Sequence, residues 1–278
     1  MSSRRDAVNR VHIARAQISV PRGPRAAALK FRMPPATGFG HDPAIMTDDL
    51  IEPAVSETEE PEACPRCGKP PKLCVCEGIQ PLPNKMELLI LQHPQEQDKE
   101  LGTAKLTLLH LQNAHFRIGL SWASLSKAVG REVTPSKWAV LYLGSTDMKT
   151  LPADKEIVAV DAKGLPLADQ FDPFKGLQGI ILLDGTWSQA KTLWWRNAWL
   201  LKCRRFVLNP KRPSAYGKLR KEPRRESLST LEAAAMLLSR LEKNPAIEDA
   251  MRASFDKLLA AYKANQPKRD WRRRPGRR

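Results

Sequence analysis

Short apolar runs alternate with helical patterns along most of the chain, which is typical of an α/β domain. Several of these runs are continuously apolar, as expected for strands of a parallel sheet covered on both faces. The predicted strands span residues 86–92, 138–143, 157–160, 179–183 and 205–208. The predicted helices span residues 103–113, 188–201, 230–241 and 247–263. The pattern therefore predicts a parallel sheet with flanking helices.

The two ends of the chain lack this pattern. Residues 1–45 are rich in Arg, Pro and Ala without a sustained period, and we predict that they are a disordered tail. Residues 46–63 hold seven acidic side chains and no basic one, so the domain is predicted to be preceded by an acidic linker that completes the segment 1–63. Residues 263–278 are predicted to be a basic tail. The folded domain is then expected over residues 64–262.

The charge balance points to a polyanionic partner. The chain has 46 Lys and Arg against 30 Asp and Glu, a formal net charge of +16, so RNA or DNA is the first candidate. No apolar run approaches the roughly 18 residues that span a bilayer, and no signal-type apolar block follows the N-terminus. We therefore expect a cytoplasmic protein with no membrane partner.

Four of the five cysteines lie close together, at Cys64, Cys67, Cys74 and Cys76. The spacing C-x2-C, six residues, then C-x-C allows four thiolates to close around one tetrahedral Zn²⁺. The alternatives are a pair of disulfides, which a reducing compartment disfavours, or spare thiols. Because all four ligands would come from the protein, residues 64–80 are predicted to hold a structural zinc ion.

A turn at the end of the fourth predicted strand is the first candidate for chemistry. The strand runs into Asp184, and Gly185, Thr186 and Trp187 precede a helix. Ligands of open α/β sheets bind beyond the carboxyl ends of strands, so Asp184 is placed where it can accept a proton or hold a cation. The alternative is helix punctuation, with Thr186 or Ser188 as the N-cap and Trp187 in the core.

Two other segments have the same double interpretation. Ser229 and Glu232 fit a capping box, but the same helix start can also receive an anionic ligand group. The segment Gln92-His93-Pro94-Gln95-Glu96 closes the first predicted strand and is either a strand-end turn with a solvated His93 or a second wall of the site.

A basic stretch covers residues 204–225, with nine cationic side chains against one acidic one. Such a loop can follow a phosphate backbone, and Tyr216 can stack on an exposed base; the alternative is a solvated charged face. The predicted RNA-binding residues are Arg212, Lys218, Arg220, Lys221, Arg224 and Arg225.

These pieces, in this order, resemble the DTW-domain family. The resemblance rests on Asp184-Gly185-Thr186-Trp187 (a D-x-T-W signature) and is reinforced by the four cysteines. His93-Pro94 with Glu96, and the stretch 229–233, extend it, so that the similar region runs from about residue 64 to about residue 241.

The resemblance implies a tRNA-uridine aminocarboxypropyltransferase. Such an enzyme moves the 3-amino-3-carboxypropyl group of S-adenosylmethionine to N3 of a tRNA uridine, giving acp3U and methylthioadenosine. A relationship to SPOUT-type RNA methyltransferases implies a trefoil knot. The residues expected to be catalytic are Asp184, Thr186 and Trp187. The residues expected to bind the donor are His93, Leu183, Gly185, Leu228, Ser229, Thr230 and Glu232.

Two other functions compete with this one. A methyltransferase would use the same donor in a different pose and release S-adenosylhomocysteine. A zinc-bearing RNA-binding protein without catalysis would not bind S-adenosylmethionine. The sequence indicates no oligomeric state.

Overall fold

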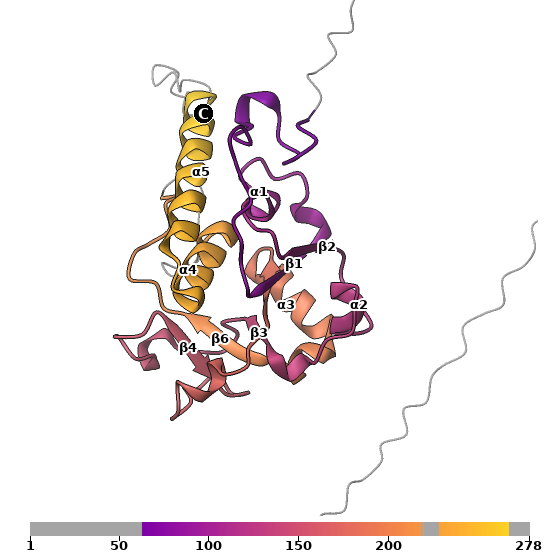
Figure 1. Cartoon of the computed structure of the whole chain (residues 1–278), viewed down its shortest axis with the longest axis vertical. Helices are drawn as coiled ribbons and strands as arrows, with labels where there is room; N and C mark the ends of the chain where they lie inside the picture. Colours follow the sequence, from indigo (N-terminus) through magenta and orange to yellow (C-terminus); the bar gives the residue numbers. More distant parts are fainter. Residues whose placement is uncertain (1–62, 218, 220–227, 267–278) are drawn as a thin grey trace, which may run out of the picture. The chain divides into compact units, whose positions relative to one another are not determined.

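The computed structural model describes residues 63–217, 219 and 228–266, and within them the fold is a six-stranded sheet (Figure 1). The strand order is β2-β1-β5-β3-β6-β4. All neighbouring pairs are parallel except β4 and β6, which are antiparallel. The strands are β1 Glu87–Gln92, β2 Ala114–Ile118, β3 Trp138–Leu141, β4 Ile157–Val160, β5 Gly179–Asp184 and β6 Arg204–Leu208.

Helices cover both faces of the sheet. The α-helices are α1 Ala104–Leu109, α2 Leu125–Val129, α3 Trp187–Arg196, α4 Thr230–Glu242 and α5 Pro245–Ala264. The short 3-10 helices are η1 Pro71–Leu73, η2 Pro94–Glu96, η3 Pro135–Lys137, η4 Met148–Thr150, η5 Asp172–Phe174 and η6 Ala198–Lys202. In the described ranges, no helix is both long and apolar enough to span a bilayer.

The alternation of side chains along β1 explains the layers. Leu88 and Ile90 pack in one core with residues of α1, α4 and α5, whereas Leu89 and Leu91 pack in another with α2, η6 and Trp194 of α3. All four side chains are fully buried. A strand covered on both faces reads as a continuous apolar run, which is why these strands were recognisable in the sequence.

The mixed α/β class and the flanking helices are confirmed, but three details of the prediction are wrong. The sheet is not wholly parallel, since β4 runs antiparallel to β6. The helix expected over 188–201 is two elements, because the buried Asn197 lies between α3 and η6 and its side chain bonds the carbonyls of Leu120 and Leu193. The helix expected over 103–113 ends at Leu109.

Two elements, β2 and α2, carried too little pattern to be predicted. Strand β2 lies at the edge of the sheet, and none of its residues is fully buried. An edge strand of this kind, with His115 and Arg117 among five residues, does not show the apolar run of a central strand. Helix α2 has only five residues.

The strand order places the carboxyl ends of β1 and β5 side by side. These strands are neighbours, but β1 leads to α1 on one face and β5 leads to α3 on the other. The chain therefore departs in opposite directions from two adjacent carboxyl ends. This is a topological switch point, where open α/β sheets bind their ligands.

Candidate functional site

Asp184 lies at the switch point, and both its oxygens are held. It is the last residue of β5 and pairs in register with Gln92, the last residue of β1. The Gln92 amide Nε2 donates to Asp184 Oδ2 over 2.8 Å, and the Thr230 hydroxyl donates to Oδ1. The Asp184 side chain is only partly buried. Three elements thus hold one carboxylate at the carboxyl edge of the sheet.

The start of α3 forms one side of this edge. Thr186 is the N-cap, its hydroxyl accepting from the Gln189 amide while its own amide donates to Gln189 Oε1 over 2.6 Å. Gly185 is required by packing, since a Cβ there would lie 2.8 Å from Cβ of Gln189. The Gln189 side chain also donates to Gln95 over 3.3 Å, which joins α3 to the turn after β1.

The start of α4 forms the other side and is buried. Ser229 is the N-cap, and Glu232 completes a capping box with it. The Glu232 carboxylate also accepts from the Ser214 hydroxyl over 2.6 Å and from the Ala215 amide over 2.8 Å. The Leu231 amide donates to Thr103. Glu232 therefore joins two segments of the chain on either side of residues 216–228.

The structure brings most of the predicted site residues to one edge. His93, whose amide donates to the Asp184 carbonyl over 3.0 Å, lies beside Gly185. Thr186 is exposed and Trp187 is half-buried at the start of α3. Leu183 and Leu228 are half-buried. Glu232 is 3% exposed, with its carboxylate engaged by protein donors.

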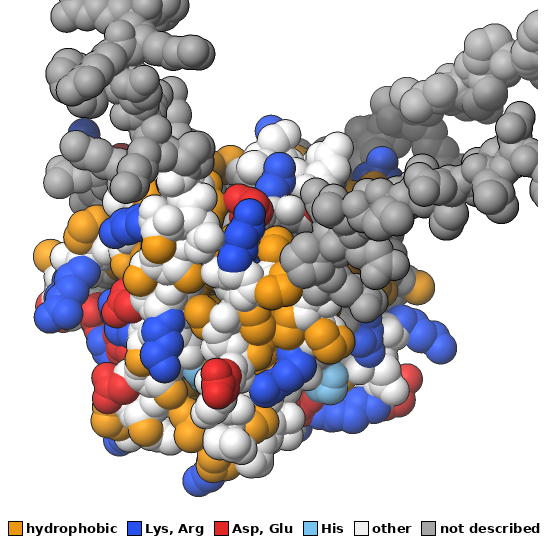
Figure 2. All heavy atoms as spheres, turned by 90° about the horizontal axis from the view of Figure 1, so that it is seen from above, with side chains coloured by type: hydrophobic (Ala, Val, Ile, Leu, Met, Phe, Trp, Pro, Cys, Tyr) orange, Lys and Arg blue, Asp and Glu red, His pale blue; other side chains and the backbone are white. Residues whose placement is uncertain are grey.

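The predicted RNA-binding residues are only partly within the described ranges. Arg212 is exposed, whereas Lys218, Arg220, Lys221, Arg224 and Arg225 lie outside the described residues. The prediction that Tyr216 stacks on a base is wrong, because its ring is 1% exposed and packs edge-on against Phe255. On the face in Figure 2, Lys and Arg side chains are spread among hydrophobic and uncharged ones.

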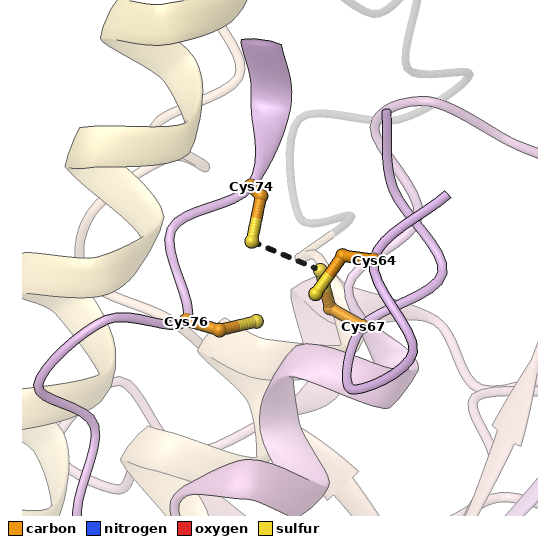
Figure 3. Close-up of side chains that lie close together, drawn as sticks. All are labelled: Cys64, Cys67, Cys74 and Cys76. Atoms are coloured by element: carbon orange, nitrogen blue, oxygen red, sulfur yellow. Dashed lines mark hydrogen bonds between the residues drawn. The ribbon is translucent and has the colours of Figure 1, made fainter. Parts of the chain in front are cut away.

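The four predicted zinc ligands converge (Figure 3). Their sulfur atoms all lie within 4.8 Å of one another, and those of Cys67 and Cys74 are 3.9 Å apart. A tetrahedral ZnS4 centre with bonds of about 2.3 Å separates its sulfurs by about 3.8 Å. A disulfide needs about 2.05 Å, so the distances fit a shared metal ion and not a disulfide. This cluster can hold a metal ion.

Local backbone and burial shape the cysteine cluster. Gly68, at φ 69°, makes the turn after Cys67. The Cys67 amide hydrogen bond lowers the pKa of Cys64 to about 6, whereas burial raises the pKa of Cys67 and of Cys76. A buried thiolate is favourable only beside a cation, which agrees with a metal site.

The cysteine segment is anchored to the rest of the fold. Leu73 of η1 is 1% exposed and belongs to the core formed with α4 and α5. Lys69 is 4% exposed, and its ammonium donates to the carbonyls of Glu100 and Gly102 over 2.6 and 2.8 Å. Burial lowers the pKa of Lys69.

A separate cavity of about 420 Å³ lies at the start of β6 and the end of β4. Its walls include Leu167, Trp194, Leu201 and Arg205. Arg205 donates to the carbonyls of Tyr142 and Leu143. The cavity is lined by none of the residues predicted for the site, so it is a feature apart from the Asp184 edge.

Two contacts of the site were not predicted from the sequence, although Gln92 belongs to the segment 92–96, for which a second wall of the site is one interpretation. Gln92 holds Asp184, and Thr103 caps α4 from a segment 128 residues away. For Gln92 a signal was present: it is a polar residue at the end of a strand whose four preceding residues are all apolar and buried. For Thr103 no pattern in the sequence indicates the partner.

Comparison with known proteins defines the class. A family model described as "DTW domain" matches residues 61–263. The chain therefore belongs to the DTW-domain family, and the Asp184 edge carries that family's signature turn.

Particular relatives have a more specific description. The chain is 31% identical to "tRNA-uridine aminocarboxypropyltransferase 2" of Macaca fascicularis over 209 residues and of Mus musculus over 206 residues. Each alignment covers 73% of this chain, and the chain spans 64% of the length of each of these relatives. The protein of the same description from Drosophila melanogaster is 26% identical, with 73% and 76% covered. No solved structure gave a significant match.

Proposed function

We propose that this protein transfers the 3-amino-3-carboxypropyl group of S-adenosylmethionine to N3 of a tRNA uridine. The bond between the donor's γ-carbon and its sulfonium breaks, and the electron pair goes to sulfur, leaving neutral methylthioadenosine. A bond forms between that carbon and N3, and the N3 proton is released. The product is acp3U.

One observation carries the proposal: the signature turn lies at the switch point of a sheet, inside the region similar to named transferases. Asp184 is partly exposed there, and the chain leaves the paired carboxyl ends of β1 and β5 toward opposite faces of the sheet. Similarity alone indicates the reaction class, and the position of Asp184 supports it because ligands of such sheets bind at this edge.

Asp184 is suited to bind the donor's ammonium group. Each oxygen already accepts one hydrogen bond, from Gln92 or from Thr230, and a carboxylate oxygen has a second lone pair to offer. The described residues bring no Lys or Arg ion pair to it. Orientation of the donor decides which of its three electrophilic carbons is presented to N3. Abstraction of the N3 proton is the alternative role for Asp184.

The remaining predicted residues have proposed roles around Asp184. Thr186 would hydrogen-bond the substrate through its hydroxyl proton, and Trp187 would form an apolar wall. His93, Leu183, Gly185, Leu228, Ser229 and Thr230 would line the donor site. Glu232 would act indirectly, by holding the start of α4 in place.

The tRNA would be bound by the basic stretch. Glu232 joins Ser214 and Ala215 to Ser229, so the two ends of the segment 216–228 are held at the start of α4. Thr230, the next residue, contacts Asp184. The predicted contacts Lys218, Arg220, Lys221, Arg224 and Arg225 belong to the segment bounded in this way, and Arg212 lies just before it.

Zinc would have a structural role. With four cysteine ligands no coordination position is open for substrate, so the ion would stabilise the segment before β1. Metal analysis of the purified protein tests this: we expect about one zinc per chain, lost in Cys67→Ser and retained in Cys203→Ser. Full retention in Cys67→Ser would contradict the assignment.

Two finer expectations belong to the same proposal. The SPOUT relationship implies a trefoil knot, and an experimental structure whose chain closes no knot would contradict it. The cytoplasm is the proposed compartment, which imaging of the tagged protein in cells tests.

The proposed reaction is tested by nucleoside mass spectrometry of tRNA lacking acp3U, incubated with the protein and S-adenosylmethionine. We expect a uridine heavier by one aminocarboxypropyl group, with methylthioadenosine released. Asp184→Asn should abolish it, and Asp256→Asn on the exposed side of α5 should not. A methyl-sized gain with S-adenosylhomocysteine would support a methyltransferase instead. No gain, and no binding of the donor, would support a non-catalytic RNA-binding protein.

A further inference from the structure

Gln92 is a buried polar residue in a strand whose other buried residues are all apolar. It ends β1 after the buried residues 88–91, and it is itself 3% exposed. Its neighbours on both sides are strands, β5 and β2. A buried amide costs free energy unless its hydrogen-bonding atoms find partners, so its presence calls for an explanation.

The orientation of the Gln92 amide is determined by its partner. A carboxylate only accepts hydrogen bonds, so the atom 2.8 Å from Asp184 Oδ2 is the nitrogen. The carbonyl oxygen Oε1 is then the remaining atom. It is buried and has no hydrogen-bond partner within the described part of the chain. Gln92 is therefore half satisfied: its donor holds Asp184, and its acceptor is left unpaired.

Holding Asp184 does not by itself explain this arrangement. Thr230 holds the other Asp184 oxygen through a hydroxyl, whose single polar atom thereby has a partner. Gln92 instead adds a second acceptor next to the carboxylate. Acceptors gathered around one point favour a ligand group that carries several protons, and a primary ammonium has three.

We propose that Gln92 is a positioning residue for the amino-acid end of the donor. Its Nε2 fixes the Asp184 carboxylate, and its Oε1 accepts a hydrogen bond from the ligand's ammonium group. This inference rests on the proposed function for the identity of the donor. With the ammonium bound by both residues, the chain from the α-carbon to sulfur is directed so that the γ-carbon faces the acceptor.

The proposal is tested by binding two ligands that differ in this group. S-Adenosylhomocysteine has the amino-acid end, whereas methylthioadenosine lacks it. Their affinities are measured by calorimetry on the full chain, for the wild type and for Gln92→Met, which preserves length and removes both polar atoms. We expect the affinity for S-adenosylhomocysteine to fall at least tenfold and that for methylthioadenosine to stay within twofold.

A matched control separates this effect from general destabilisation. Gln170→Met removes an amide that bonds the backbone of Ala159 on β4, across the sheet from Gln92. It should change neither affinity. Equal losses for both ligands in Gln92→Met, or no loss for either, would overturn the role of Gln92.

A second variant keeps the test decisive if Gln92→Met does not fold. Gln92→Glu retains an acceptor, and when protonated the new carboxyl group can also donate to Asp184. Two carboxylates bind an ammonium group more tightly than one, so the affinity for S-adenosylhomocysteine should fall as pH falls and the new carboxyl group takes up a proton, relative to the wild type; a parallel pH profile would count against the proposal.

The two levels of the proposal fail differently. If the wild type binds neither ligand, both the donor assignment and the role of Gln92 are overturned. If it binds S-adenosylhomocysteine with the expected split between variants but modifies no tRNA, the role of Gln92 stands and the transferase reaction does not.

Discussion

Helices α3 and α4 both start at the Asp184 edge, and both start with a capping box, but the two boxes differ in burial. At α3 the N-cap Thr186 is exposed. The Gln189 side chain accepts a hydrogen bond from the Thr186 amide and donates one to Gln95. At α4 the N-cap Ser229 is 2% exposed and Glu232 is 3% exposed. The same local motif thus lies in water in one case and in the core in the other.

The difference in burial changes the hydrogen bonds that the third residue of each helix makes. Gln189 at α3 makes contacts near the surface, whereas Glu232 at α4 accepts from Ser214, Ala215 and Ser229. A capping box is a local device worth about 1 kcal/mol, but a buried one becomes a tertiary connection. Substitutions at the start of α4 should therefore lower the free energy of unfolding more than the matching substitutions at the start of α3.

The largest difference is expected at the third helical residue. Glu232→Ala leaves three donors without their acceptor in a largely buried place and should lower the free energy of unfolding by roughly 3–4 kcal/mol. Gln189→Ala at the exposed box should lower it by about 0.5 kcal/mol. Urea unfolding of both variants measures this, and equal losses would show that burial does not distinguish the boxes.

The buried side also contains a titratable group, His110, which follows α1 where α1 packs against α4. Burial lowers its pKa to about 4, and neither ring nitrogen has a partner among the described residues. The unfolded chain binds the proton below about pH 6.5. The free energy of unfolding should therefore fall as the pH is lowered from 6.5 to 4, and His110 should account for about 3 kcal/mol of that fall.

The variant His110→Phe isolates that effect. It has an apolar ring of similar size, so the fall in unfolding free energy between pH 6.5 and pH 4 should be smaller by about the same 3 kcal/mol. Above pH 6.5 the unfolding free energies of the wild type and the variant should change with pH in the same way. Identical slopes over the acidic range would contradict the assignment to His110.

Loss of the hydrogen bond between Thr230 and Asp184 should affect the proposed activity more than the stability of the fold. Thr230→Val preserves shape and removes the hydroxyl that holds Asp184, so the proposed transfer should slow about tenfold, which equals about 1.4 kcal/mol. Thr230→Ser should restore most of the rate. Thr192→Val, which removes a hydroxyl within α3, is the control and should leave kcat unchanged.

The smallest difference is expected between the two N-caps. Ser229→Ala should lower the free energy of unfolding by about 1–2 kcal/mol, and Thr186→Ala by about 0.5 kcal/mol, since water replaces the exposed hydroxyl. Thermal unfolding of the two variants compares them directly. A larger loss for Thr186→Ala would reverse the comparison.

Local patterns in the sequence predicted the local structure well. The four cysteines converge as their spacing indicates, and the Ser229–Glu232 box is present at the start of α4. The central strands were recognisable because each is short and apolar on both faces. Edge strand β2 and the break at Asn197 were missed, since neither shows a period that separates it from its surroundings.

What the sequence by itself determined is thus the set of elements, the cysteine cluster and the helix starts, because spacing and period act over a few residues. Only the tertiary structure decided the site around Asp184. Gln92 and Thr230 lie 92 and 46 residues from it along the chain. They meet because β1 lies beside β5 and α4 packs against the sheet. The local sequence pattern does not determine this arrangement, since many strand orders are compatible with it. The contacts that orient the carboxylate are therefore a consequence of packing.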